Sequence, residues 1–267
     1  EDGLIAGPRL FISGRALSQT GGHGDFRRRT DDSVACSCSS ALHLTSRIAD
    51  GVDQVRHAVR DELRKGADQI KIMVSGGVSS PFDPLEGCQF SMSEIEAAVD
   101  EATRAGTYVL AHAYSADAIT RALNAGVRTI EHGNLIDQKA ADLAAEKNAF
   151  VVPTLVAYEA QARHAQGAGY SQAMLDKLGR VREAGLRSLE ICKTAGVRMG
   201  FGTDIIGDQE LHTQEFLLRA QVLPAHEIIA SATRIGAEIL RREGELGVIA
   251  PGATADILVI DGNPLED

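Results

Sequence analysis

Tryptophan is absent from this sequence, and aromatic residues make up only 4% of its 267 positions. Basic residues are also scarce relative to acidic ones, since the formal net charge is −10 and the single basic cluster is Arg27–Arg29. This balance argues against nucleic acid as a partner. No apolar run approaches the roughly 18 residues that a membrane span needs, and no signal peptide is recognisable. The sequence therefore predicts a protein that binds neither nucleic acid nor membrane.

Cysteine is sparse as well, with four residues at positions 36, 38, 88 and 192. The spacing of Cys36 and Cys38 is one residue short of the C-x-x-C pattern of metal and redox sites. We therefore expect free thiols, which are typical of a reducing compartment. This interpretation predicts a cytoplasmic protein.

The most informative stretch is Asp68–Gly77, a short apolar run that reads as a β-strand and ends in a glycine pair. Lys71 lies in its middle, and a strand that is apolar on both faces is usually buried. Burying an unpaired ammonium is costly. The lysine could pair with a carboxylate, lose its proton, or react with CO2 to form a carbamate that bridges two metal ions.

Strand-like and helix-like segments alternate along the chain, which indicates a parallel α/β sheet. We expect strands at residues 9–13, 69–75, 108–113, 127–132, 149–155 and 197–203. A closed parallel barrel has eight strands. The sequence thus predicts a (β/α)8 TIM-type barrel whose first two strands are missing, over residues 1–243.

Residues 244–267 form a different kind of segment, rich in turns and followed by a predicted strand at 255–260. We interpret it as a fragment of a small β-sandwich domain. Residues 3–8 read like the interior of a larger protein, and the chain stops directly after the last predicted strand. We therefore expect a chain that is truncated at both ends.

Polar residues fall within or at the ends of four predicted strands: Lys71, His112, His132 and Asp204. In a parallel barrel the carboxyl ends of all strands open on one face, where active sites are built. Imidazole and carboxylate are the ligands that zinc prefers. Other interpretations stay open: the histidines could be core residues bonded to backbone, Asp204 could cap a helix, and Glu131 could replace His132 as a ligand.

Several motifs resemble those of the amidohydrolase superfamily. They are Ile70–Met73, Ala111–Tyr114, Ile130–Gly133, Phe201–Asp204 and the C-terminal segment Gly247–Pro264. The loop Ser18–Asp25 is similar to that of bacterial binuclear-zinc dipeptidases that cleave Xaa-Pro, and of relatives that cleave Xaa-Arg or Xaa-Lys. The resemblance covers essentially the whole chain.

The resemblance implies a role for each strand-end residue. Lys71 would be carboxylated and would bridge two zinc ions. His112 and His132 would bind one ion, while Asp204 would bind the other and act as general base on a metal-bound hydroxide. His23 and Tyr114 would contact the substrate carbonyl or the oxyanion that develops from it.

One departure from the family pattern is clear, because none of the eight histidines lies in the His-x-His pair that the family carries on its first strand. That pair supplies ligands to the metal that Asp204 also binds. We therefore expect this chain to hold part of a metal site and to be inactive by itself.

The predicted function is metal-dependent hydrolysis of the amide bond in a small-molecule or dipeptide substrate, with Xaa-Pro as first choice, by a homo-oligomeric protein. The alternatives are an Xaa-Arg or Xaa-Lys carboxypeptidase, a cyclic-amide hydrolase like imidazolonepropionase, and an inactive fragment. Deaminases of the superfamily generally use one metal and lack the bridging lysine, so Lys71 argues against them. Specificity would reside in the loops at 14–50, 76–92 and 156–172.

Overall fold

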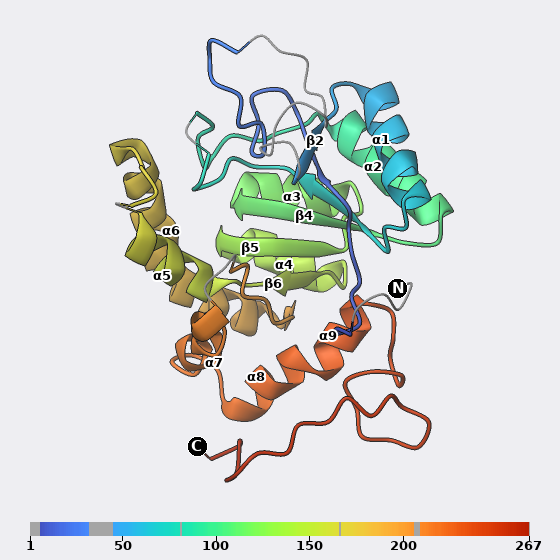
Figure 1. The fold of residues 1–267 in the computed structure, drawn as a ribbon, viewed down its shortest axis with the longest axis vertical. Coiled ribbons are helices and arrows are strands. Elements are labelled where there is room, and N and C mark those ends of the chain that lie inside the picture. The colour runs from blue at the N-terminus through green and yellow to red at the C-terminus, as the bar shows by residue number, and fades with distance from the viewer. Residues whose placement is uncertain (1–5, 32–44, 81, 166, 206–208, 267) are drawn as a thin grey trace.

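The computed structural model describes residues 6–31, 45–80, 82–165, 167–205 and 209–266 (Figure 1). These residues build one parallel sheet in the strand order β2-β1-β3-β4-β5-β6-β7. The strands are β1 (Ala16–Ser18), β2 (Ser46–Ile48), β3 (Ile70–Met73), β4 (Val109–Ser115), β5 (Thr129–Leu135), β6 (Phe150–Val152) and β7 (Arg198–Met199). The predicted parallel α/β architecture is confirmed. The sheet is open in the described residues, since β2 and β7 do not pair with each other.

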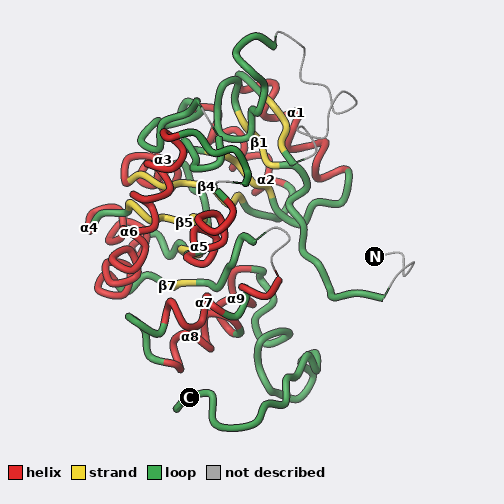
Figure 2. Tube along the Cα trace, turned by 60° about the vertical axis from the view of Figure 1, so that its left-hand side comes forward, coloured by secondary structure: helices red, strands yellow, loops and turns green. Residues whose placement is uncertain are grey.

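Helices connect the strands and supply most of the remaining core. The helical segments are α1 (Val52–Arg64), α2 (Met92–Arg104), α3 (Ala116–Asn124), α4 (Gln138–Glu146), α5 (Leu155–His164), α6 (Gln172–Ala195), the 3-10 turn η2 (Gln209–Leu211), α7 (Gln214–Arg219), α8 (Ala225–Ala232) and α9 (Arg234–Ile239). Helices α5 and α6 lie side by side, beyond the carboxyl ends of the central strands (Figure 1 and Figure 2).

Local sequence explains where several helices begin. Ser91 starts α2 with a capping box, in which its side chain accepts from the Glu94 amide while the Glu94 carboxylate accepts from the Ser91 amide. Ser115, Asp137 and Ser171 cap α3, α4 and α6 in the same side-chain-to-amide manner. These caps satisfy amide groups that would otherwise lack partners.

The two faces of the sheet differ in chemistry. Apolar side chains at alternate positions, among them Ile70, Ile72 and Ile130, are fully buried in the core formed with the helices. The intervening positions carry Lys71 and Glu131, which the strand register places on the opposite face. Lys71 is half-buried there, not fully buried as the apolar run suggested. The helices thus leave this face available for polar groups.

The expected strand at 9–13 is wrong. Leu10 and Ile12 are 65% and 46% exposed, and the ladder to β3 begins later, at the pair Leu17–Ile72. Ile12 is tied instead to Asp68, whose carboxylate accepts from the Ile12 amide at 2.7 Å. The strands β1 and β2 both fall within the region expected to be a long loop at 14–50, because short polar strands carry little apolar pattern.

The expected strand at 255–260 is also wrong. In the described residues it has no neighbouring strand to complete a hydrogen-bond ladder, and Leu258 and Val259 are 91% and 95% exposed. Residues 155–164, expected as a strand end and loop, form α5. The C-terminal helical region consists of short pieces, with η2 and α7 separated at residues 212–213 and α8 and α9 separated at Thr233. The proposed domain boundary near residue 243 stays a prediction.

Two simpler expectations concern membranes and thiols. Within the described residues, even the longest helix, α6, has too many charged side chains to cross a bilayer, and no other helix qualifies. Cys88 and Cys192 are free thiols, as expected. Cys36 and Cys38 lie outside the described residues.

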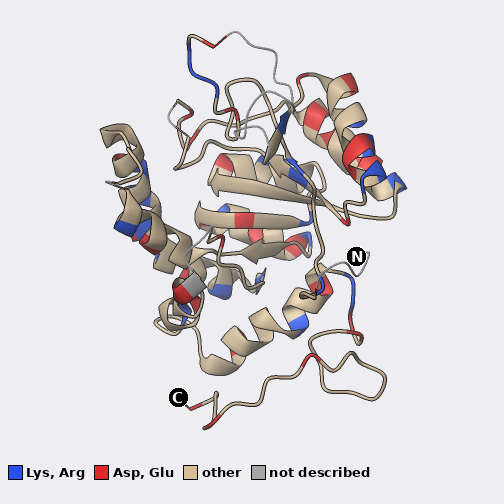
Figure 3. Ribbon diagram, in the orientation of Figure 1, with Lys and Arg blue, Asp and Glu red and all other residues tan. Residues whose placement is uncertain are grey.

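An ion-pair network joins α1 to α2, where acidic and basic side chains alternate (Figure 3). The Glu101 carboxylate accepts from Arg60 at 2.5 Å and from Arg56 at 2.7 Å. The Arg60 hydrogen bond, against a smaller opposing effect of burial, lowers the pKa of Glu101 from 4.5 to about 2. The folded-state pKa lies below the unfolded value, so this stabilisation is present above about pH 4.5 and is lost as the pH falls through about 2.

We therefore predict that Glu101→Gln lowers the free energy of unfolding by about 1 kcal/mol at pH 7, because its arginine partners are largely exposed. The difference from the wild type should disappear near pH 2. Urea unfolding monitored by circular dichroism at both pH values measures it. Glu96→Gln, an exposed position of the same helix, is the control. A deficit that persists in acid would contradict an electrostatic origin.

Candidate active site at the carboxyl ends of the strands

Two imidazoles meet midway along the neighbouring strands β4 and β5. His112 and His132 are buried, and their ring centroids lie 4.7 Å apart. His132 has a backbone φ of 75°, a left-handed conformation that residues other than glycine seldom adopt. Its Nδ1 lies 2.7 Å from the Thr154 hydroxyl, and His112 Nε2 lies 3.0 Å from the carbonyl oxygen of Gly76. Each ring is therefore oriented by a neighbouring strand end.

A third imidazole comes from the loop after β1. The His23 ring stacks on His112 with centroids 4.3 Å apart, and its Nδ1 lies 2.6 Å from the Ser80 hydroxyl. The Gln89 side chain fixes the backbone by accepting from the His23 amide at 2.8 Å. Although they lie far apart in the chain, His23 and His112 occupy one cluster.

Tyr114 completes the aromatic side of the cluster. Its ring stacks on His132 at 5.2 Å, and its hydroxyl lies 3.2 Å from that of Tyr158 on α5. The Tyr158 hydroxyl donates to Tyr114 and also lies 3.1 Å from Asn134 Oδ1, and Asn134 donates to the Val181 carbonyl of α6. This buried chain of hydrogen bonds ties Tyr114 to the two helices beyond the strand ends.

Lys71 and Asp204 both act electrostatically on His23, Lys71 lowering and Asp204 raising its pKa against the larger effect of burial. Among the described residues, neither side chain makes a hydrogen bond or a close ion pair. Burial raises the pKa of the Asp204 carboxyl group, and the positive charge of Lys71 partly offsets that rise. Asp204 is accessible to solvent although protein atoms surround its carboxyl group, and like His132 it has a left-handed backbone, with a φ of 49°. Strained backbone of this kind tends to concentrate at functional sites.

Burial sets the protonation states of the cluster. It lowers the pKa of His23 to about 4, with Asp83 acting weakly in the opposite direction. The pKa values of His112 and His132 lie well below 6.5 for the same reason. Burial also raises the pKa of the Tyr114 hydroxyl well above 10. At neutral pH the three rings are therefore uncharged and the phenol keeps its proton.

The open alternatives can now be weighed against the geometry. The hydrogen bond of His112 to a backbone carbonyl is the contact expected for a core histidine, but its packing against two further imidazoles is not. Glu131 accepts from the Thr129 hydroxyl at 2.8 Å and lies opposite His112 in the strand register, where Lys71 opposes the burial that raises its pKa, so Glu131 stays an alternative ligand. Among the described residues no helix begins directly after Asp204, but residues 206–208 lie outside them, so the helix-cap alternative stays open.

The sequence profile of the Amidohydrolase family matches residues 1–267. The chain belongs to the amidohydrolase family. Ochratoxinase from Aspergillus niger is 34% identical to this amidohydrolase over 277 aligned residues, which cover 100% of this chain and 57% of the relative.

Two solved structures extend the comparison. A prolidase complexed with N-methylphosphonate-L-proline is 55% identical with a TM-score of 0.94, covering 99% of this chain and 65% of that one. A Xaa-Pro dipeptidase with bound methionine is 34% identical with a TM-score of 0.87, at the same coverages of 99% and 65%. This amidohydrolase thus spans under two thirds of the relatives it matches.

Members of this family are generally metal-dependent, so the site can be tested for a fit to metal. Among the described residues, no three His, Cys, Asp or Glu side chains are grouped closely enough to hold an ion. The donor chemistry nevertheless fits: His112 and His132 are neutral imidazoles, the form that binds metal. The Lys71 and Asp204 side chains, which would complete the ligand set, make no hydrogen bond among the described residues.

Sequence reasoning missed the residues that orient this amidohydrolase's cluster. Ser80 and Gln89 hold His23, and Thr154 holds His132. These serine, glutamine and threonine residues lie in polar loops with no periodic pattern, so composition could not single them out. Asn134 carried the best available signal, since it follows His132 by two positions.

Proposed function

We propose that this amidohydrolase, in its full-length form, hydrolyses the amide bond of a small molecule or dipeptide, with Xaa-Pro dipeptides as the first choice. The observation that carries the proposal is the neutral cluster of His23, His112 and His132 beside Lys71 and Asp204, at the carboxyl ends of parallel strands. The 55% identity to a prolidase that binds a phosphonate analogue of a prolyl dipeptide supports the choice of substrate. A cytoplasmic homo-oligomer stays a prediction from the sequence.

In this proposal Lys71, His112, His132 and Asp204 hold two zinc ions, with Lys71 carboxylated at Nζ. Bound zinc would activate water and polarise the scissile carbonyl. The Lys71 ammonium is half-buried and has no hydrogen-bond partner among the described residues. Carboxylation would replace this positive charge with an anion that zinc could bind.

Asp204 acts as the proton carrier in this proposal. Its carboxylate accepts a proton from the attacking water and delivers it to the nitrogen of the leaving amine. Burial raises the pKa of the Asp204 carboxyl group above its ordinary value, which makes the carboxylate a stronger base. A base of intermediate strength suits a residue that must both take and release a proton.

In this proposal His23 and Tyr114 donate hydrogen bonds to the substrate carbonyl. Both are uncharged at neutral pH and both can donate a hydrogen bond, the ring through its free nitrogen and the phenol through its hydroxyl. Donors fixed in advance around a developing oxyanion contribute strongly to catalysis. The Ser80 and Tyr158 contacts supply that fixing.

A dipeptide library presented to the zinc-loaded, full-length protein tests the substrate. The proposal predicts that Xaa-Pro dipeptides are hydrolysed in preference to other sequences. Cleavage of Xaa-Arg, Xaa-Lys or cyclic amides, with Xaa-Pro left intact, would reject the first choice. The Aspergillus niger relative named ochratoxinase makes ochratoxins a useful second panel.

Gly77 provides a test of the role of His23. A Cβ at this position would lie 2.1 Å from His23 Cε1, so Gly77→Ala must displace the ring. We predict a loss of kcat/KM of roughly 10²-fold, as expected for an ångström-scale misplacement. Initial rates with the best dipeptide measure it.

Gly179→Ala is the matched control, because a Cβ there meets no atom within 4 Å. It should leave kcat/KM unchanged and stabilise α6 by up to about 1 kcal/mol. Full activity in Gly77→Ala would exclude His23 from the reaction.

A further inference from the structure

Lys177 makes an unusual set of contacts with the loop that follows β3. It projects from α6, and its Nζ donates to the carbonyl oxygens of Gly77 at 2.6 Å, Ser80 at 2.6 Å and Asp83 at 3.0 Å. An ammonium has three donors, so its hydrogen-bonding capacity is filled by backbone alone. One side chain therefore ties together three points of a loop about a hundred positions away in sequence.

The same three loop residues surround the His23 ring. The Ser80 hydroxyl lies 2.6 Å from His23 Nδ1, and the Asp83 carboxylate lies 3.8 Å from it. The Gly77 backbone passes so close that any Cβ would overlap the ring, while its amide donates to Asp83 Oδ2 at 2.7 Å. The groups that orient His23 are thus the groups whose backbone Lys177 holds.

Besides Lys177, the loop is held by the Gly77 amide–Asp83 hydrogen bond within it, by backbone hydrogen bonds near its two ends, and by the buried side chains of Val78 and Leu85. Its described segments at 76–80 and 82–90 contain no helix or strand, only the isolated bridge between Ser75 and Cys88. Ser80 and Asp83 are nevertheless buried, at 1% and 6% exposure. Removing Lys177 would leave three carbonyl groups without their donor in a largely buried setting, which favours rearrangement of the loop.

We propose that Lys177 is a positioning residue for His23: by fixing the backbone at Gly77, Ser80 and Asp83, it sets the ring against His112 and toward the substrate. The role of Lys177 depends on the proposed function in one respect, which is the catalytic effect of His23. The loop geometry stands independently of it. Lys177 acts through the loop and has no direct role in the chemistry.

A double-mutant cycle on the zinc-loaded, full-length protein tests the coupling. Lys177→Met should lower kcat on the best dipeptide by roughly 10-fold or more, by misplacing His23. In a His23→Ala background the same substitution should have less than about a twofold further effect, because its only route is already removed. Equal effects in the two backgrounds would overturn the proposal.

Ser80→Ala keeps the Lys177 contacts, which are to backbone, and removes only the hydroxyl on His23. It should reproduce part of the Lys177→Met defect, and its effect should also vanish in the His23→Ala background. This variant keeps the test decisive if Lys177→Met fails to fold. Full activity of Ser80→Ala together with additive behaviour would count against the proposal.

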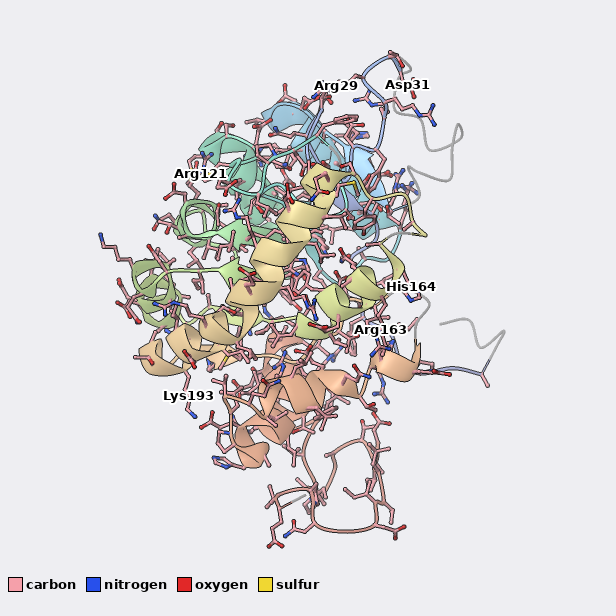
Figure 4. All side chains as sticks on the ribbon, turned by 90° about the vertical axis from the view of Figure 1, so that its left-hand side faces the viewer. Arg29, Asp31, Arg121, Arg163, His164 and Lys193 are labelled. Carbon is pink, nitrogen blue, oxygen red and sulfur yellow. The ribbon has the colours of Figure 1, made fainter. Side chains whose placement is uncertain are left out.

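Lys193→Met is the matched control on the same helix. Lys193 lies at the far end of α6 and points away from the body of the molecule (Figure 4). Its contacts are long, 3.5 Å to the Val222 carbonyl and 3.8 Å to Glu227. This substitution should leave kcat unchanged.

Hydrogen exchange separates the two proposals. Lys177→Met should accelerate exchange at the Gly77 amide and its loop by about 10-fold or more, while Lys193→Met should not. Unchanged exchange would overturn the role of Lys177 whatever the enzyme hydrolyses. If Lys177→Met accelerates exchange but the wild-type protein cleaves no amide, the proposed function is rejected while the role of Lys177 in holding the loop is supported.

Discussion

Asp204→Asn should lower turnover by the full-length protein by roughly 10³-fold, within the range for loss of a general base. An amide cannot carry the proton from water to the leaving amine. The fold should survive, because Asp204 is exposed and makes no hydrogen bond in the described residues. Its backbone φ of 49° also suits Asn, which tolerates the left-handed region as well as Asp does.

The measurement is kcat on the best dipeptide, together with the free energy of unfolding from urea titration. Asp142→Asn, at an exposed position of α4 where the carboxylate accepts only from Gln138, should change neither quantity. Unaltered turnover in Asp204→Asn would remove Asp204 from its proposed role. A large loss of stability would mean that the residue is structural.

Arg219→Met should destabilise the protein by about 3–5 kcal/mol, the effect of breaking a buried ion pair. Arg219 and Glu215 are both fully buried and meet at 2.7 Å. Arg219 also donates to the carbonyl oxygens of Pro153 and Gly200, at the ends of β6 and β7. The substitution leaves a buried carboxylate unpaired and two carbonyls without donors.

Urea unfolding of Arg219→Met against Arg182→Met measures this effect. Arg182 pairs with Glu159 at 2.6 Å but is 51% exposed, so its loss should cost less than about 1 kcal/mol. Adding Glu215→Gln to Arg219→Met should recover part of the stability, because it removes the unpaired charge. Similar losses in the two arginine variants would contradict the account.

The sequence predicted the parts of this protein that local pattern encodes. The strand at Lys71 and the helix that starts at Ser91 carry strong signals, an apolar run in one case and a capping box in the other. The meeting of His112 and His132 followed from topology, since parallel strands of one sheet run side by side in the same direction, whereas His23 was placed at the site only by the family resemblance.

The remainder depends on contacts that no local pattern records. Residues 255–260 have the apolar alternation of a strand, but a strand forms only where a neighbour completes its ladder. Lys177 reads as an ordinary helix-surface lysine until the fold brings it to Gly77. The orientation of His132 likewise depends on Thr154, a residue in an unpatterned turn.

A crystal structure of the full-length protein grown with zinc, with anomalous scattering data collected at the zinc edge, tests the central claim most directly. We predict two zinc peaks among Lys71, His112, His132 and Asp204, with continuous density for a carboxylate on Lys71 Nζ between them. Zinc bound elsewhere, or these four side chains free of zinc at full loading, would contradict it.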